Sequence, residues 1–589
     1  MWRSMVRGDR RVSSLLLVLS IAACAPQPSA PATQPGGGAD ATSQPRRVST
    51  TLNVAIIGDV QGMSITGDPT TAGGWQTINE IHTEGLITSD VNSRKPVGRL
   101  ADRVPSFDDN SIQLLPDGRM RVTYALRKGV TWQDGQPFTA SDMQFAYEMS
   151  RDPAIPAVSR DAYTQMDVVD AVDEATLAIT FKAPYYLGAT LGPRLFWPMP
   201  QHLLAEPFAA YQASKNVEEF LHNPYWTTGY VNTGPFRVTT FEPGSGITFQ
   251  AYDGYFLGRP KLDVIRLQTF GDQNALFASL LAGATDMVVD SAISSADLGF
   301  QLKDRWDGSG QGTVNVVRGT TWFLTPQWRP AVQAEAANLD VRVRQALYYA
   351  LDREALADGL LAGHRELTAW SLLPEEDANF AATKDSLRPF GYDPARARAT
   401  LQAAGWSSAP DGSVHSAVDG RDLHTSIWTV SGRDKEIAAF AAYWRQIGLA
   451  VDEVTLTAAQ TRDSQYRASY TGWESTAQGS GDAVFAKFEG PPASAENRWS
   501  GNRGGYDDPL GQGFVTTYRR SIRPDDQLAA VKALSDYEVS QLPLLVLYFT
   551  PRFLGARKGV KAFDDVAGGS EASVPYGTYT RNAHLWDVE

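Results

Sequence analysis

Residues that could carry out chemistry are few and scattered in this chain of 589 residues. Helical metal sites use histidines three or four positions apart, and no two histidines here have that spacing. The sequence also lacks the GxxxxGKS/T loop that holds phosphates and the GxSxG turn of serine hydrolases. We therefore expect a protein that is not an enzyme and that uses no metal ion or cofactor. The histidines are His82, His202, His222, His364, His415, His424 and His584.

The single cysteine, Cys24, excludes an intramolecular disulfide and a thiolate metal cluster. It follows an arginine-rich leader and an apolar run that is about half the ~20 residues of a membrane-spanning helix, so residues 1–23 are predicted to be a secretory signal. The run ends in Ile21-Ala22-Ala23-Cys24, which resembles a bacterial lipobox. The resemblance implies that Cys24 is diacylated and becomes the mature N-terminus. A plain signal peptide, with Cys24 incidental, is the alternative.

Residues 24–50 are rich in Pro, Ala, Gly and Ser. Such a segment cannot bury enough apolar surface to fold, so we expect a disordered tether with a reach of ~25–30 Å. No later stretch is apolar enough to span a membrane. The sequence therefore predicts an exported body attached to the cell membrane through Cys24, on its periplasmic or extracellular side.

The composition excludes one class of partner. The formal net charge is -13, and no basic block is present, whereas nucleic-acid binding needs clustered lysine and arginine. Hydrophobic residues make up 43% and charged residues 20%, as in soluble globular proteins, and the length allows about three to four domains.

Strand and helix patterns alternate along the body. Period-two alternation around Pro116-Asp117-Gly118 predicts an antiparallel hairpin. Helices are predicted after the caps Thr139, Asp340 and Asp393, and a further helix is predicted to end at Gly283. The apolar run 542–549 is typical of a strand buried on both faces. These patterns indicate a large mixed α/β protein.

Several segments occur in an order that resembles the family 5 solute-binding proteins of bacterial ABC importers, which include oligopeptide-, dipeptide- and nickel-binding proteins. They cover most of the body, from about residue 52 to 549. The segments are TEGLITSD (83–90), YALRKGVTWQDGQPFTASDMQFAYE (124–148), NTGPFRVTTFEPGSGITFQAYDGYFLGRPKLDVI (232–265), LDVRVRQALYYALDREAL (339–356), YDPARARATLQAAGW (392–406) and YWRQIGLAVD (443–452).

The resemblance implies a two-lobed periplasmic-binding-protein fold of cluster C, with mixed sheets and a discontinuous first lobe. Hinge strands are expected near 319–324 and 545–549. Closure of the lobes would exclude water and strengthen polar contacts to a ligand. The implied division is lobe I at 51–95, 228–318 and 546–589, a lobe I subdomain at 96–227, and lobe II at 319–545.

Peptide-binding members carry a Gly-Trp loop with an aspartate three residues after the tryptophan, which pairs with the peptide amine. Here Gly472 and Trp473 fit that motif, but the aspartate position holds Thr476. A hydroxyl cannot offer a charge-assisted bond to an ammonium. Glu474 or Asp482 would have to substitute, or the ligand lacks a free amine there.

Three further tryptophans are expected to line the ligand site, because aromatic walls with a few polar anchors are typical of small-molecule clefts. Trp75 follows Gly73-Gly74 at the first lobe I loop, Trp428 follows a lobe II strand, and Trp322 lies in the expected hinge. Packing in the core is the alternative for any of them.

The sequence therefore predicts a lipid-anchored, monomeric binding protein that delivers a peptide or peptide-like solute to an ABC permease and ATPase complex. The ligand's identity stays open among oligopeptide, dipeptide, sugar and nickel chelate. A structural or sensory surface lipoprotein of the same fold is the alternative, and a secreted hydrolase ranks lowest.

Overall fold

The computed structural model describes most of the chain beyond residue 49. The described residues are 50–58, 60, 63–64, 79–90, 95–157, 160–289, 292–375, 377, 379–380, 390–479, 481–499, 501–562 and 579–589. The expected signal (1–23), Cys24 and most of the tether lie outside them, and so does Trp75.

The secondary structure is mixed, as the sequence patterns indicate. The strands are β1 Thr51–Ile57, β2 Ile87–Ser89, β3 Pro96–Gly98, β4 Ile112–Leu114, β5 Met120–Ala125, β6 Met166–Asp173, β7 Thr176–Phe181, β8 Phe236–Glu242, β9 Gly246–Ala251, β10 Val264–Phe270, β11 Met287–Val288, β12 Gly312–Pro326, β13 Trp406–Ser408, β14 Val414–Ser416, β15 His424–Val430, β16 Ala450–Leu456, β17 Trp473–Gly479, β18 Leu545–Arg557, β19 Val560–Lys561 and β20 Asp587–Val588.

The helices are α1 Asn79–His82, α2 Ala140–Ser150, α3 Asp161–Gln165, α4 Gln201–Ser214, α5 Val217–Leu221, α6 Gln273–Ala282, α7 Ala296–Ser309, α8 Val341–Tyr349, α9 Arg353–Leu360, α11 Pro394–Ala403, α12 Asp434–Gln446, α13 Ala458–Arg462, α14 Ser464–Arg467, α15 Pro509–Arg520 and α16 Pro524–Gln541. Short 3₁₀ helices are η2 Pro224–Trp226, η4 Ala336–Leu339, η5 Arg365–Leu367, η7 Gly481–Phe488 and η9 Ala583–Leu585.

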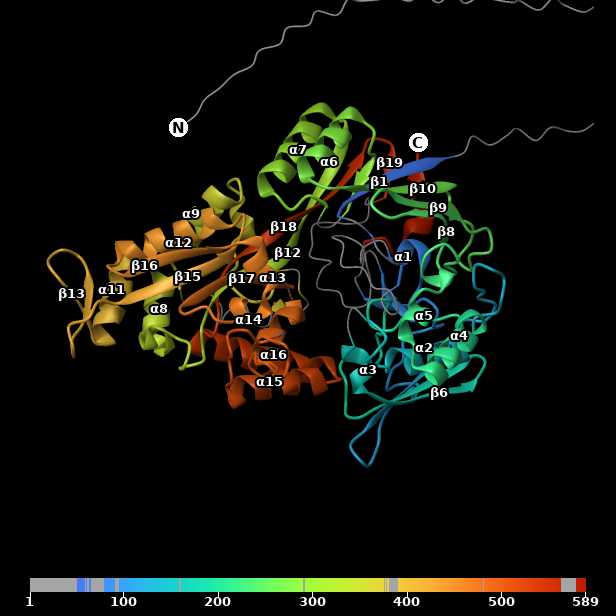
Figure 1. The fold of residues 1–589 in the computed structure, drawn as a ribbon, viewed down its shortest axis with the longest axis horizontal. Coiled ribbons are helices and arrows are strands. Elements are labelled where there is room, and N and C mark those ends of the chain that lie inside the picture. The colour runs from blue at the N-terminus through green and yellow to red at the C-terminus, as the bar shows by residue number, and fades with distance from the viewer. Residues whose placement is uncertain are drawn as a thin grey trace, which may run out of the picture. The chain divides into compact units, whose positions relative to one another are not determined.

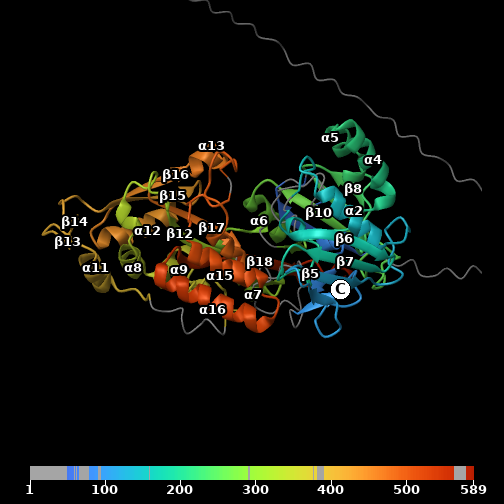
Figure 2. The same cartoon turned by 90° about the horizontal axis from the view of Figure 1, so that it is seen from below.

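One ten-stranded sheet organises the body, with the order β16-β15-β17-β12-β18-β11-β1-β10-β9-β8. Its two longest members, β12 and β18, pair antiparallel from Gly312 opposite Arg557 to Leu324 opposite Leu545, with a register shift after Arg318. A four-stranded sheet, β4-β5-β7-β6, forms separately. Figures 1 and 2 show β13–β17 with α8, α11 and α12 at one end of the molecule, and the four-stranded sheet with α2 and α4 at the other.

The buried side chains form two hydrophobic clusters. One contains strands β1, β5, β7, β9 and β10 with α2 and α4, and the other contains β15, β17, α8, α12, α15 and α16. Residues of β12 and β18 occur in both: Val317 and Leu554 lie in the first, and Phe323 and Phe549 lie in the second. The β12–β18 pair therefore connects the two cores.

The local signals in the sequence have clear physical causes in the structure. Asp272 caps α6 by accepting the backbone N–H of Asn274 and Ala275 at 2.9 and 3.0 Å, and Gly283 ends it with φ 77°. In the predicted hairpin, side chains of β5 alternate between buried and half-buried, and Gly118 of its turn has φ 88°. Asp340 and Asp393 cap α8 and α11 as expected.

Candidate functional site

Strand β17 carries the motif residues and lies between β15 and β12. Because side chains alternate along a strand, Trp473 and Ser475 point to one face of the sheet, and Glu474 and Thr476 point to the other. Gly472 precedes the strand at a close backbone approach, where an added Cβ would lie 2.3 Å from the Ser426 carbonyl oxygen. A glycine is therefore required for the strand to reach its neighbour.

Trp473 lies inside the second hydrophobic core. Its side chain is completely buried, with its ring centroid 5.3 Å from that of Trp444 on α12. Its indole N–H donates to Asn338 Oδ1 at 3.0 Å. In this structure the ring is inaccessible to a molecule in solution.

Trp322 shares the Trp473 face of the sheet, since its indole N–H donates to Ser475 Oγ at 2.9 Å. The ring is parallel to that of Tyr548 at a centroid distance of 6.0 Å, and the Arg433 guanidinium lies 4.7 Å from its centroid. Trp322 is buried, so little of its ring is accessible to a molecule in solution in this structure.

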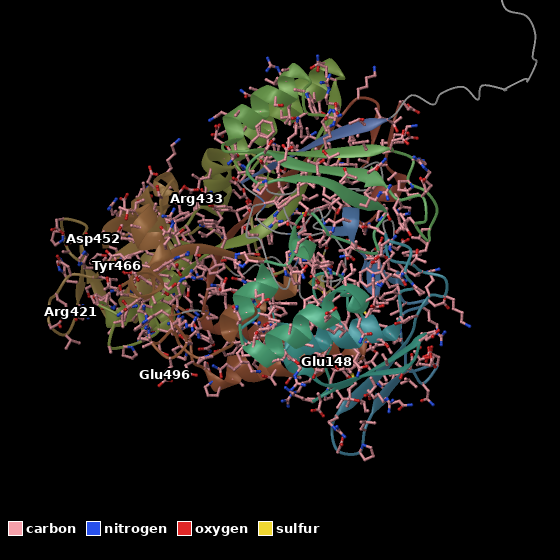
Figure 3. All side chains as sticks on the ribbon, turned by 45° about the vertical axis from the view of Figure 1, so that its right-hand side comes forward. Glu148, Arg421, Arg433, Asp452, Tyr466 and Glu496 are labelled. Atoms are coloured by element: carbon pink, nitrogen blue, oxygen red, sulfur yellow. The ribbon has the colours of Figure 1, made fainter. Side chains whose placement is uncertain are left out.

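Trp428 in β15 is opposite Glu474 in the parallel β15–β17 pairing, so both side chains lie on the same face. Trp428 is half-buried, donates its N–H to Ser426 Oγ at 3.0 Å, and packs 5.8 Å from Tyr466. Figure 3 labels Arg433 and Tyr466, the side chains that cover Trp322 and Trp428. The expected site residues are thus divided between the two faces of one sheet.

Glu474 is buried, and two guanidinium groups surround it. Arg503 donates to Glu474 Oε1 from Nη2 at 2.8 Å and from Nε at 3.2 Å. Arg467 Nε lies 3.3 Å from the same oxygen. This carboxylate therefore already has two cationic partners, so a ligand ammonium would be a third.

Lys487 on η7 reaches the same region. Burial lowers the pKa of its ammonium to about 8, an effect that the nearby Glu474 charge opposes and that Arg503 and Arg467 reinforce. Its Nζ lies 5.8 Å from the centroid of the Phe323 ring. Within the part of the chain that the structure describes, Lys487 has no hydrogen-bond or ion-pair partner.

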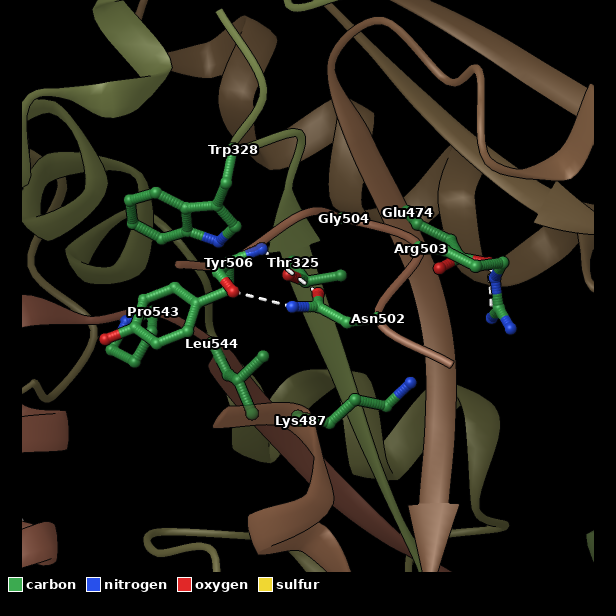
Figure 4. A pocket seen from close by; sticks show the side chains of 10 residues that line it. All are labelled: Thr325, Trp328, Glu474, Lys487, Asn502, Arg503, Gly504, Tyr506, Pro543 and Leu544. Atoms are coloured by element: carbon green, nitrogen blue, oxygen red, sulfur yellow. Dashed lines mark hydrogen bonds and ion pairs between the residues drawn. The ribbon is translucent and has the colours of Figure 1, made fainter. Parts of the chain in front are cut away.

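A cavity of about 20 Å³ separates these charged groups from an apolar wall. Glu474, Lys487 and Arg503 lie on one side of it in Figure 4, and aromatic and aliphatic groups lie on the other. That volume holds about one water molecule. The full lining is Thr325, Trp328, Glu474, Lys487, Asn502, Arg503, Gly504, Tyr506, Pro543 and Leu544.

Two expected residues remain without a described side-chain environment. Asp482 lies in η7, but its side chain is outside the described residues, as is all of Trp75. Thr476 is buried beside Phe323 of β12, on the Glu474 face.

Sequence reasoning missed Lys487, Arg467 and Arg503. The one signal for Lys487 was its place as a single charge in the apolar run AVFAKF.

The described residues include neither a helix long and apolar enough to cross a membrane nor a group of three or more His, Cys, Asp or Glu placed to hold a metal ion.

The fold is that of the periplasmic binding proteins. The oligopeptide-binding protein from Thermus thermophilus, solved with a pentapeptide, matches with TM-score 0.68 and 20% identity over 91% of this chain and 96% of its own. NikA from Brucella suis, solved with Fe(III)-EDTA, matches with TM-score 0.70 and 17% identity over 92% and 100%. NikZ from Campylobacter jejuni, solved with Ni(L-His), has TM-score 0.68 and 20% identity over 91% and 99%.

Residues 96–495 match the bacterial extracellular solute-binding proteins, family 5, and the chain belongs to this family. A putative ABC transporter peptide-binding protein of Brucella ovis is 25% identical over 354 residues, which are 58% of this chain and 58% of that protein. The glutathione-binding protein of Shigella dysenteriae is 24% identical over 452 residues, which are 73% of this chain and 78% of its own length. These matches confirm the family resemblance, and they are to binding proteins rather than enzymes.

Proposed function

We propose that this protein is the substrate-binding component of an ABC importer and captures a peptide or a peptide-like solute. The observation that carries the proposal is the family 5 match over residues 96–495. The peptide- and glutathione-binding names of the relatives favour a ligand with peptide bonds. A permease and an ATPase would then receive the solute.

The ligand would lie between two lobes, divided at the boundaries expected from the sequence: lobe I at 51–95, 228–318 and 546–589, its subdomain at 96–227, and lobe II at 319–545. Two features support this division. The four-stranded sheet falls wholly within 96–227, and the paired strands β12 and β18, which contain the expected hinge segments, contribute residues to both cores.

Contacts to the ligand would come from Gly472, Trp473, Glu474, Thr476 and Asp482, together with Trp75, Trp322 and Trp428. The proposal that the ligand contacts the Glu474 face of the sheet is supported by the position of Trp428, which is opposite Glu474 in the adjacent strand. Because Trp473 and Trp322 are buried, their part would be to fix the strands β17 and β12 that present this face.

The body would be exported and held at the membrane by a lipid on Cys24, with residues 25–50 as the tether. The support is the sequence alone, namely the apolar run that ends in Ala22-Ala23-Cys24. Mass spectrometry of the native protein checks it, since a diacylated Cys24 adds the mass of two acyl chains and a glycerol to the mature N-terminus.

A thermal-shift screen of the mature protein against tripeptide pools and glutathione tests the function. A ligand at ~100 times its Kd stabilises a protein by ~2.7 kcal/mol, which raises the melting temperature measurably. A protein that no peptide stabilises, and that purifies with none, would not be a peptide receptor.

A further inference from the structure

The turn between α15 and α16 lies against the proposed lobe I subdomain. Figure 1 shows both helices close to α3, and two hollows of about 540 and 430 Å³ are lined by residues of both parts. Ile522 of this turn packs against the first hydrophobic core, whereas Val515 of α15 and Val531 of α16 belong to the second. The turn therefore makes a contact between the two cores that is separate from the β12–β18 pair.

One backbone hydrogen bond crosses this contact. The last four carbonyl groups of a helix have no partner within the helix. At the end of α15, Ser521 donates to two of them, from Oγ to the Thr517 carbonyl at 2.8 Å and from its N–H to the Tyr518 carbonyl at 3.1 Å. The Arg519 carbonyl instead accepts the N–H of Tyr186, at 2.9 Å. The subdomain thus completes the C-terminus of a helix in the proposed lobe II.

Two arginines of the same segment lie over aromatic rings of the subdomain. The guanidinium carbon of Arg519 is 5.8 Å from the centroid of the Tyr186 ring, and that of Arg523 is 5.7 Å from the centroid of the Phe107 ring. Both distances are within the range of a cation–π attraction. An ion pair with Glu489 Oε2, at 2.6 Å, holds Arg519 in place. All of these partners are protein groups, so the contact does not depend on a bound solute.

We propose that this interlobe contact keeps the protein largely closed before a ligand arrives. The assignment rests on the two-lobe division of the proposed function, and it adds that part of the free energy of closure comes from the protein itself. These residues are separate from the lining of the cavity beside Glu474. The interlobe contact consists of Phe107 and Tyr186 on the subdomain and of Tyr518, Arg519, Ile522 and Arg523 on α15 and the turn that follows it.

The consequence for binding follows from the population of the closed form. A ligand that binds only the closed form has an apparent Kd equal to its intrinsic Kd divided by the closed fraction. A contact that raises this fraction therefore raises the affinity without touching the ligand. The two hollows lined by both parts leave the contact narrow, so we expect it to separate when a solute enters or leaves.

The test measures closure in the mature protein after any bound solute has been removed by unfolding, dialysis and refolding. Small-angle scattering gives the radius of gyration, and hydrogen exchange gives the protection of the Tyr186 amide. We expect this amide to be protected in wild type. Arg519→Gln combined with Arg523→Gln removes both cation–π contacts, so this double variant should have a larger radius of gyration and at least tenfold faster exchange at Tyr186.

Lys435→Gln combined with Arg462→Gln, at exposed positions of α12 and α13, makes the same change in net charge and should behave as wild type. Neither measurement uses a ligand. A protein that binds no peptide would therefore lose the proposed function without affecting this result, and a protein that lacks the interlobe contact could still bind peptides.

Two results would overturn the proposal. In one, the Tyr186 amide of wild type exchanges as fast as that of an unstructured peptide. In the other, the folded Arg519→Gln, Arg523→Gln variant matches wild type in both measurements. If that variant does not fold, Phe107→Leu combined with Tyr186→Leu removes the two rings from the other side of the contact, and it must produce the same opening for the proposal to stand.

Discussion

Arg503 donates to one carboxylate oxygen of Glu474 from two nitrogens, at 2.8 and 3.2 Å. The two residues lie 29 positions apart in the chain, so the contact joins strand β17 to the loop that precedes α15. It makes Glu474 part of a built ionic cluster rather than an isolated acid.

Glu474→Gln separates two roles for this acid. If Glu474 positions the arginines, the affinity for tripeptides with a free C-terminal carboxylate should rise a few-fold, because the site becomes more positive. Loss of the ion pairs should lower the free energy of unfolding by about 1–2 kcal/mol, discounted from the value for fully buried pairs because the arginines are partly exposed. Titration calorimetry and urea denaturation measure the two effects.

Glu496→Gln is the control, since Glu496 is exposed. A drop of about tenfold or more in peptide affinity for Glu474→Gln alone would favour the other role, in which Glu474 accepts the ligand amine.

Trp473→Phe tests whether this tryptophan acts through packing. The change keeps most of the ring but removes the N–H that Asn338 accepts at 3.0 Å, so we expect a loss of about 1–3 kcal/mol in unfolding free energy. Peptide affinity should stay within about threefold of wild type, by calorimetry. Trp428→Phe, on the other face of the sheet, should show the reverse: little loss of stability and weaker peptide binding.

Tyr186 of the proposed lobe I subdomain contacts two residues of the proposed lobe II. The Tyr186 N–H donates to the Arg519 carbonyl at 2.9 Å, and the Tyr186 ring lies 5.1 Å from that of Tyr518. An aromatic pair contributes about 0.5–1.5 kcal/mol, so Tyr186→Ala should shift the population toward an open form by up to about tenfold. Small-angle scattering should show a larger radius of gyration. Tyr392→Ala, at an exposed position, should leave it unchanged.

The preference for peptides with a free C-terminal carboxylate (acid) over amidated peptides (amide) should depend on pH. Because burial lowers the pKa of Lys487 to about 8, its ammonium is charged at pH 7 and largely neutral at pH 9 in the free protein. The charged groups that face it are Glu474, Arg467 and Arg503. The acid-to-amide affinity ratio should therefore fall as pH rises, whereas the ratio for Lys487→Gln should be flat. A rising ratio would contradict a charged Lys487 in the site.

Helices and strands could be predicted from the sequence where interactions between residues close in the chain determine their ends. Asp272 and Gly283 bound α6 because capping and a left-handed glycine act within a few residues. Of the run 542–549, residues 545–549 form a buried strand, whereas residues 542–544 precede it and β18 continues to Arg557. Its extension is held by pairing with β12, more than 200 positions away in the sequence, and no local pattern reports such pairing.

The site was harder to predict for the same reason. A motif indicates that Trp473 and Glu474 lie near a ligand loop, but only the pairing of β17 with β15 and β12 decides which of them faces Trp444 and which faces Arg503. Lys487 and Arg503 come from separate segments that carry no spacing signal. Only the tertiary fold brings these two side chains close to each other.

The β12–β18 pair has a consequence for the energetics of ligand capture. Its ladder is interrupted opposite Thr550, between Arg318 and Thr321, and its register shifts again between Trp322 and Phe323. We expect twisting of the ribbon to concentrate in those few residues, where the register is irregular. Closure around a bound solute would then be opposed only by the torsional stiffness of this short segment. A substitution that restricts the backbone at Gly319 or Thr320 would slow capture and release together.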